Sequence, residues 1–272
     1  MKIGQRQFDL QGHTYIMGIL NVTPDSFSDG GSYKTLDDAL KRVEVMIKEG
    51  ADIIDIGGES TRPGYTLLPD EEEISRICPV IEAVKKNFDI PVSADTYKSQ
   101  VAAAALDSGA DLINDIWGLK YDDKLAGVIA GSGAACCLMH NRRSADYQDF
   151  MPDCLSDLKE TLDLAKAAGI KREKIIIDPG VGFGKTLEHN LLVMKHLKDF
   201  NAFGLPVLLG TSRKSMIGKT LDVPVGERLE GTLVTTVMAV MAGVRFIRVH
   251  DILSNKRAVM MSEAILKAGE QA

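Results

Sequence analysis

The chain has 272 residues and a formal net charge of −6 at pH 7, with a sequence pI of about 5.5. This charge argues against a generally basic surface that would bind nucleic acid or an anionic membrane, so anion chemistry must come from locally placed arginines and lysines. With 45% hydrophobic residues the chain can bury a substantial core, and it contains no apolar stretch of about 18 residues that would predict a membrane span.

The four cysteines predict reduced thiols in the core of a cytoplasmic protein. None of them forms a C-x-x-C pair, and the amino terminus has no apolar signal core. Cys136 and Cys137 are adjacent in an apolar run, so they are expected to point to opposite faces of a strand.

In chain order, Phe8 to Tyr15 predict a short N-terminal β-hairpin around Gln11-Gly12. From Ile16 onward an apolar run, a polar or glycine-bearing tip and an amphipathic helix recur. The predicted strands are Ile16–Leu20, Ala51–Ile56, Pro91–Ala94, Asp111–Ile113, Ala134–Met139, Lys174–Ile177, Pro206–Leu209 and Val244–Val249. The predicted helices begin near Leu36, Pro69, Lys98, Asp122, Cys154, Leu187, Gly226 and Leu253, with start signals at Ser32 and Asp153 and stop signals at Gly50, Gly109, Gly169 and Gly243.

Eight such units, without a linker or a break in composition, predict one α/β domain over residues 1–272 with the fold of a (β/α)8 TIM barrel. A doubly wound open sheet has the same alternation and is the competing architecture. The insertions after the first, second, fifth and seventh strands would lie at the carboxyl face, where barrel enzymes carry their sites; they are Asn21–Lys34, Gly57–Leu68, Asn141–Pro152 and Thr211–Val225.

The segment from Ile175 to Lys185 predicts a buried strand, a carboxylate at its tip and a glycine loop before a helix. Its glycines would let backbone approach a flat or charged ligand closely. It matches neither nucleotide motif: a P-loop needs glycine where Pro179 stands, and a G-x-G-x-x-G needs glycine where Lys185 stands.

Polar residues end almost every predicted strand, and a closed barrel would aim them at one mouth. In chain order they are Asn21, Asp55 with Glu59, Asp95, Asn114 with Asp115, His140, Asp178, the Thr211–Ser215 loop, and Arg248 with His250. Each alone has a simpler explanation, because polar residues commonly end strands and cap helices. Asn114 and Asp115 point to opposite faces, so only one of them can face the barrel axis.

These tips divide into two chemical groups. Asp95, Asn114 and Asp178, near Lys214, suit a flat nitrogen heterocycle, whose amidine-like edge a carboxylate can bind with two parallel hydrogen bonds. A second set suits a phosphate or diphosphate, with Asn21 as a hard oxygen for Mg²⁺; it comprises Arg62, Arg248 and His250. A Schiff-base role for Lys214 and a metal-ligand role for His140 are disfavoured by their sequence surroundings.

The motifs resemble those of the dihydropteroate synthase family along the length of the chain. The stretches that carry the resemblance are Met17–Gly31, Asp55–Gly64, Ser93–Tyr97, Ile113–Asp115, Asp178–Lys185, Ser212–Ser215 and Arg248–His250. The resemblance implies a transferase of folate biosynthesis that joins (7,8-dihydropterin-6-yl)methyl diphosphate to 4-aminobenzoate, releases diphosphate and is a sulfonamide target. It also implies Mg²⁺ as cofactor and a homodimer.

The resemblance further implies residue roles. Asp95, Asn114, Asp178 and Lys214 would be catalytic and contact the pterin. Asn21 would meet Mg²⁺ and diphosphate, and Arg248 and His250 the diphosphate. The remaining implied substrate contacts are Thr61, Arg62, Pro63, Met139, Phe183, Gly210 and Ser215, with Phe183 and Ser215 on the aminobenzoate.

We therefore expect an SN1-like reaction with assisted departure of diphosphate. Two rivals remain: a methyltransferase barrel with a similar pterin pocket, and a pterin-binding protein without activity. Neither needs an anion group at the same mouth. Diphosphate release on adding 4-aminobenzoate would separate all three.

Overall fold

Short apolar segments form a parallel barrel, as the sequence predicts. The computed structural model describes residues 1–22, 36–59 and 67–269, and within these ranges eight parallel strands lie in the order β8-β7-β6-β5-β4-β3-β10-β9. A parallel bridge between Ile177 and Val207 joins the two ends of this order, so the sheet closes on itself. The strands are β3 (Tyr15–Asn21), β4 (Ile53–Gly57), β5 (Val92–Asp95), β6 (Leu112–Asp115), β7 (Ala135–Met139), β8 (Ile175–Asp178), β9 (Leu208–Leu209) and β10 (Phe246–Val249).

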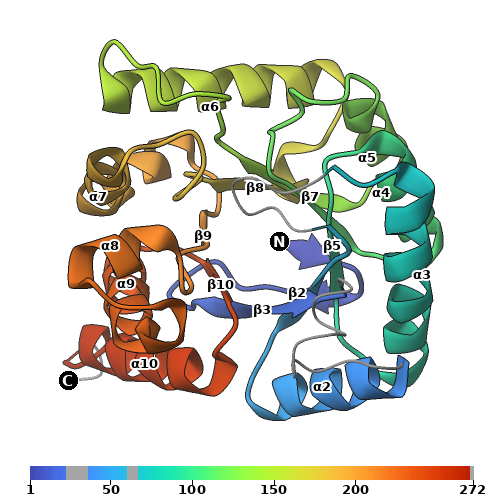
Figure 1. Ribbon diagram of the computed structural model, residues 1–272, viewed down its shortest axis with the longest axis horizontal. Coiled ribbons are helices and arrows are strands. Elements are labelled where there is room, and N and C mark those ends of the chain that lie inside the picture. The colour runs from blue at the N-terminus through green and yellow to red at the C-terminus, as the bar shows by residue number, and fades with distance from the viewer. Residues whose placement is uncertain (23–35, 60–66, 270–272) are drawn as a thin grey trace.

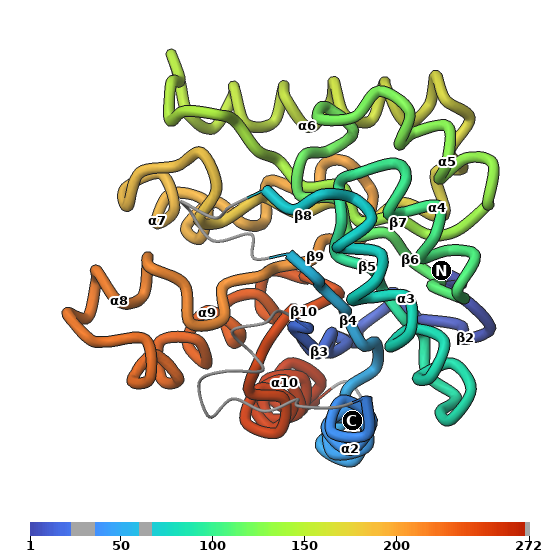
Figure 2. Tube along the Cα trace, turned by 45° about the vertical axis from the view of Figure 1, so that its right-hand side comes forward, coloured from blue at the N-terminus to red at the C-terminus, as the bar shows by residue number. Residues whose placement is uncertain are grey.

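Helices surround the barrel as a ring (Figure 1), and the last one lies beside α2, so the ring also closes (Figure 2). The α-helices are α2 (Leu36–Lys48), α3 (Asp70–Asn87), α4 (Ser99–Asp107), α5 (Leu125–Ser132), α6 (Phe150–Ala167), α7 (Leu187–Lys195), α8 (Ser215–Leu221), α9 (Leu229–Met241) and α10 (Ile252–Leu266). Among the residues described, none of these helices is long and apolar enough to cross a membrane.

Several helix boundaries differ from the sequence prediction. Helix α6 begins at Phe150 rather than near Cys154, so Asp153 lies in its first turn, where its carboxylate accepts a hydrogen bond from Gln148 N at 2.9 Å. The short helix α8 falls within a segment predicted as loop. The predicted stops are correct, because Gly50, Gly109, Gly169 and Gly243 all have positive φ. Ser32 lies outside the described residues.

The N-terminal hairpin is present, but its predicted position is wrong. The hairpin pairs β1 (Lys2–Ile3) with β2 (Arg6–Gln7) around Gly4, and Gln11-Gly12 is a bend that follows it. The prediction followed turn residues and missed the pair because two-residue strands carry no periodicity. Ile3 and Phe8 are fully buried in the barrel interior, and the amino terminus lies near the middle of the ring (Figure 1).

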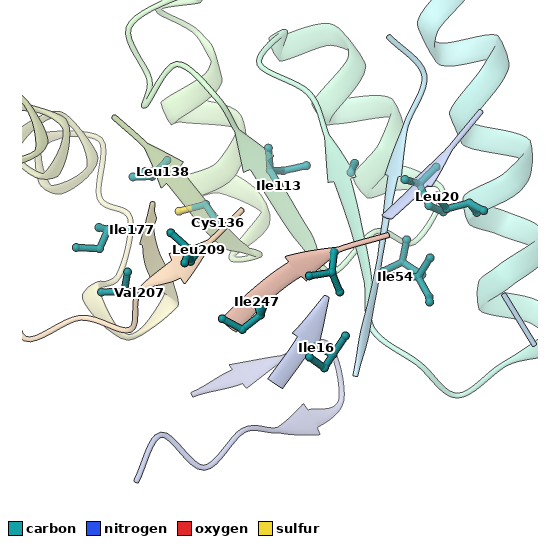
Figure 3. Packing of buried hydrophobic residues seen from close by; sticks show 14 of the residues in the cluster. Ile16, Leu20, Ile54, Ile113, Cys136, Leu138, Ile177, Val207, Leu209 and Ile247 are labelled. Atoms are coloured by element: carbon teal, nitrogen blue, oxygen red, sulfur yellow. The ribbon is translucent and has the colours of Figure 1, made fainter. Parts of the chain in front are cut away.

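Each strand contributes side chains to two different apolar cores, because its side chains alternate between the two faces of the sheet. Outward-facing side chains such as Ile16, Leu138 and Ile247 pack beneath the helices (Figure 3). Inward-facing side chains form a separate apolar cluster at the amino end of the barrel; its strand members are Tyr15, Met17, Ile53, Leu112, Ala135, Cys137, Ile176, Leu208 and Phe246. Cys136 and Cys137 belong to different clusters, as the strand pattern predicts.

The inward face changes character along the strands. Two residues beyond Ile53, Leu112, Ile176 and Phe246 in the sequence come Asp55, Asn114, Asp178 and Arg248, on the same face. Burial of the amino half therefore fixes the register that presents charged groups at the carboxyl half.

Candidate active site

An arginine joins two buried carboxylates at the carboxyl end of the barrel. Arg248 on β10 donates from Nε to Asp55 Oδ2 at 2.6 Å and from Nη2 to Asp95 Oδ2 at 2.5 Å. The side-chain amide of Asn114 lies 3.3 Å from Asp95 Oδ1 and 3.5 Å from Asp55 Oδ2. The two groups that the sequence separates into heterocycle and anion sets thus meet in one network.

Asp178 at the end of β8 and Lys214, which precedes α8, complete the cluster. A Cβ built on Gly210 would lie 3.9 Å from Asp178 Oδ2 and from Lys214 Nζ, and 3.8 Å from Arg248 Cβ, so the three side chains surround a position without a side chain of its own. Lys214 Nζ also donates to Val181 O and lies over the Phe183 ring, 4.6 Å from its centroid.

Burial shifts the titration of this cluster strongly. It raises the pKa of Asp95 to about 7, against the opposing charge of Arg248, and it raises the pKa of Asp178, against the charge of Lys214. Burial also lowers the pKa of Lys214 to about 8, although Asp178 opposes this. The cluster therefore contains one acid, Asp95, and one lysine, Lys214, that titrate close to neutrality, which is typical of catalytic and binding sites.

Asn114 and Asp115 point to opposite faces of β6, as expected. Asn114 contacts the cluster, whereas both carboxylate oxygens of Asp115 accept backbone hydrogen bonds, from Trp117 N at 2.8 Å and Leu119 N at 2.6 Å. The simpler explanation is therefore correct for Asp115. It is wrong for Asp55, which lies at the centre of the cluster.

Glu59, paired with Asp55 in the sequence reading, takes part in a different network. It accepts hydrogen bonds from Lys98 Nζ at 2.7 Å, Tyr97 Oη at 2.5 Å and Leu68 N at 2.8 Å. Lys98 Nζ also donates to Glu73 Oε2 at 2.7 Å. Glu73 is thus a buried ion-pair partner as well as part of the acidic first turn of α3.

An apolar wall faces the cluster. Tyr97, Ile116 and Met139 are buried together, with Phe183 and Trp117 packed against them. Such a wall beside hydrogen-bonding carboxylates is suited to a flat heterocycle, because it covers the faces while the polar groups bind the edge.

The glycines of the Asp178–Lys185 loop let the backbone pack closely against a neighbouring segment of the protein. Gly180, Gly182 and Gly184 have positive φ, and a Cβ on Gly180 would lie 1.8 Å from His140 O. A Cβ on Gly184 would lie 2.4 Å from Arg142 O. The expectation that these glycines admit a ligand therefore needs correction, because two of them admit the β7–α6 loop.

Lys214 follows a strained turn. Arg213 has φ +56°, which is uncommon outside glycine, and its guanidinium binds both oxygens of Asp251, at 2.9 and 2.5 Å. Ser212 Oγ lies 3.0 Å from His250 Nδ1, and Ser215 is the exposed first residue of α8. These contacts link the ends of β9 and β10, which carry Lys214 and Arg248.

The structure brings most of the predicted site residues together. Thr61, Arg62 and Pro63 lie outside the described residues. His140, expected at the mouth, instead bonds Asp157 and Lys185 behind the glycine loop. The sequence places Lys185 at the end of that loop but does not reveal its contact with His140, which comes from a distant segment.

The oxygen donors fit a magnesium ion that keeps water and substrate ligands. A Cβ on Gly57 would lie 3.8 Å from Asn21 Oδ1 and 3.6 Å from Asp95 Oδ2, so both oxygens reach one space. Asp55 Oδ1 is buried and has no hydrogen-bond partner in the described part of the chain. Within that part, no group of three His, Cys, Asp or Glu residues forms a complete protein cage. Mg²⁺ commonly needs only one or two protein oxygens beside phosphate.

Comparison with known proteins agrees with this geometry. The sequence profile of the family described as pterin binding enzyme matches residues 17–250. The chain is 57% identical over 268 residues to a dihydropteroate synthase from Clostridium beijerinckii, covering 98% of this chain and 100% of that protein.

Two solved structures have the same fold. A dihydropteroate synthase from Clostridium difficile, solved in the presence of pteroic acid, has a TM-score of 0.92 at 49% identity and covers 95% of this chain and 99% of that one. A Yersinia pestis dihydropteroate synthase with a sulfonamide drug complex has a TM-score of 0.93 at 41% identity, covering 98% and 99%.

Proposed function

Since this chain belongs to the dihydropteroate synthase family, we propose that the charged cluster at the carboxyl end of the barrel is its active site. The chain is a transferase of folate biosynthesis that forms 7,8-dihydropteroate and diphosphate from (7,8-dihydropterin-6-yl)methyl diphosphate and 4-aminobenzoate. The observation that carries the site assignment is the convergence of Asp95, Asn114, Asp178 and Lys214 beside an apolar wall.

The pterin edge is bound by Asp178 and Asn114. Asp178 uses Oδ1 to accept the amide of Gly180 at 2.7 Å and keeps Oδ2 toward the mouth. A carboxylate so held can accept hydrogen bonds from the amino-pyrimidine, and each such bond to a charged group contributes about 1.5–3 kcal/mol. Met139 covers one face, while Lys214 and Gly210 border the same space.

The aminobenzoate lies between Phe183 and Ser215, with Thr61, Arg62 and Pro63 contributing from the segment after β4. Sulfonamides compete for this place. An aryl amine is neutral near pH 7, so attack needs no strong general base. The C–O bond to diphosphate breaks, the C–N bond forms, and the amine proton passes to diphosphate or water.

The diphosphate is bound by Arg248, His250 and Asn21. Asn21 and the carboxylate of Asp95 would hold Mg²⁺, which supplies positive charge to the diphosphate oxygens. Arg248, fixed by Asp55 and Asp95, is already oriented toward the mouth before substrate arrives, so little reorganisation accompanies bond cleavage. The electron-rich pterin stabilises positive charge at its methylene carbon, so cleavage runs ahead of attack.

An assay of diphosphate release tests this function. Release should require both the pterin diphosphate and 4-aminobenzoate, and it should fall sharply when Mg²⁺ is chelated. Release without 4-aminobenzoate at the same rate would reject the synthase. Equal rates with and without Mg²⁺ would reject the metal assignment alone.

The protein is proposed to act as a cytoplasmic homodimer. Val234, Met238 and Met241 are exposed on α9, and Met260, Met261 and Ile265 are exposed on α10, which packs against it. These side chains form an apolar surface of the kind that oligomers bury. Sedimentation at micromolar concentration should give twice the chain mass, and Met238→Glu should give a monomer.

A further inference from the structure

Lys185 binds the carbonyls of the glycine loop from behind. Its ammonium donates to Gly180 O at 2.9 Å, to Phe183 O at 3.1 Å and to His140 Nδ1 at 2.7 Å. An ammonium has three donors, and all three are directed at neutral acceptors. Within the described part of the chain, no carboxylate oxygen lies within 4.0 Å of this ammonium. The contacts thus direct Lys185 to the loop rather than to an acidic partner.

His140 holds the ammonium in place. Its side chain is fully buried, and because Lys185 can only donate, His140 Nδ1 must be the acceptor. The ring proton therefore lies on Nε2, which donates to Asp157 Oδ2 at 2.9 Å. Asp157 is itself bound by Arg142, from Nε at 2.6 Å and Nη2 at 3.1 Å. The four side chains form a chain of fixed orientation from α6 to the loop.

Other residues also hold the glycine loop, but Lys185 makes two hydrogen bonds to it that no other described side chain makes. Tyr147 Oη donates to Gly184 O at 2.9 Å, and Gly182 N donates to Asn190 Oδ1 at 2.6 Å. Lys185 alone among the described side chains binds the carbonyls of Gly180 and Phe183. Gly180 N fixes Asp178, and Phe183 supports Lys214. A displacement of the loop would therefore move groups at the mouth.

We propose that Lys185 is a positioning residue, which sets the glycine loop for 4-aminobenzoate and pterin through the neutral His140 and Asp157. The inference rests on the proposed function, because the substrates that the loop serves are those of the synthase. Lys185 does not touch the reacting atoms, since its donors are all engaged on the outer side of the loop. Its effect reaches the substrates through Phe183 and Asp178.

The test replaces Lys185 by methionine, which keeps the length and removes the donors. Lys185→Met should raise the KM for 4-aminobenzoate about tenfold or more, and the KM for the pterin diphosphate by less. A group at an active site that is displaced by about 1 Å can lower the reaction rate about a hundredfold, so a tenfold effect on KM is a moderate expectation. The matched control is Lys195→Met, an exposed lysine on α7, which should leave both constants unchanged. A KM for 4-aminobenzoate within twofold of wild type in Lys185→Met would overturn the proposal.

A double-mutant cycle separates positioning from general loosening of the fold. In a Phe183→Ala background, Lys185→Met should have a clearly smaller effect on the KM for 4-aminobenzoate, because the group that Lys185 positions is gone. Equal effects in both backgrounds would reject the proposed route. If Lys185→Met fails to fold, Lys185→Gln replaces it. Its amide has two donors on a shorter stem, too few for the three acceptors, so the KM for 4-aminobenzoate should still rise about threefold to tenfold. A change below twofold rejects the proposal, whereas an inactive wild type would instead reject the proposed function.

Discussion

Ile176 and Asp178 lie two residues apart on the same face of β8, yet they belong to different halves of the barrel interior. Ile176 is fully buried in an apolar layer beneath the mouth, and Asp178 belongs to the charged cluster above it. The lower half gains stability from apolar burial, whereas the upper half keeps charges that burial disfavours. One strand can therefore contribute stability at its amino end and functional groups at its carboxyl end.

The largest expected effect is on binding at the upper half. Asp178→Ala should nearly abolish pterin binding, because a clamp of two hydrogen bonds supplies about 3–6 kcal/mol. The fold should suffer little, since the lost group is a buried carboxylate with a raised pKa. Calorimetric titration with a pterin analogue measures the first quantity, and wild-type affinity would refute the assignment.

Arg248 tests the upper half for stability as well as binding. Arg248→Ala should weaken diphosphate retention, with binding of bare pterin mostly kept. It should also lower the free energy of unfolding by about 3–5 kcal/mol at pH 8, because Asp55 and Asp95 lose their buried cation.

The stability loss in Arg248→Ala should shrink at low pH. In wild type the pKa of Asp95 is raised from 3.8 to about 7, so the folded state holds a proton that the unfolded state has released between these values. Stability therefore falls as pH rises through this range, and removing the cation deepens the fall. Denaturant unfolding at pH 5 and pH 8 checks this; a greater loss at pH 5 would contradict the sign.

Ile176 tests the lower half. Ile176→Ala should lower the free energy of unfolding by about 2–5 kcal/mol through the lost burial and the remaining cavity. Turnover per folded molecule should stay near wild type, because the side chain does not reach the mouth. Urea unfolding measures the stability, and turnover normalised by active-site titration measures the activity. If Ile176→Ala lost turnover but kept its stability, the lower half could not be the part that stabilises the fold.

His140 gives an intermediate case, a buried polar group outside the mouth. Burial lowers its pKa from 6.5 to about 4, so between these values the unfolded chain binds a proton that the folded chain refuses. Stability should therefore fall as pH drops from 6.5 toward 4, by about 3 kcal/mol from this residue. His140→Gln should flatten that part of the pH profile. A profile with the same slope in His140→Gln would disprove the linkage.

The sequence predicts the barrel well because its strands are apolar runs that end in polar tips. Each of the eight predicted strands overlaps an observed one. The tips Asp55, Asp95 and Asn114 meet, and Asp178 borders the same cluster beside Arg248 and Lys214. Pairings across the barrel could not be predicted, since Arg248 meets Asp55 only after closure. The hairpin at Lys2–Gln7 was misplaced because its strands are too short to show alternation.

The position of Lys185 was out of reach for a similar reason. A lysine after a glycine loop suggests a ligand contact, and only the fold shows that His140 and Asp157 approach it from the other side. The residue types at a site are thus more predictable than their partners, because partners depend on packing between distant segments.

The most direct test of the two halves measures 4-aminobenzoate-dependent diphosphate release per folded molecule in wild type, Ile176→Ala and Asp178→Ala. We predict equal rates for wild type and Ile176→Ala, and at least a hundredfold lower rate for Asp178→Ala at subsaturating pterin diphosphate, as expected for a loss of about 3 kcal/mol. A rate for Asp178→Ala near that of wild type would contradict this prediction.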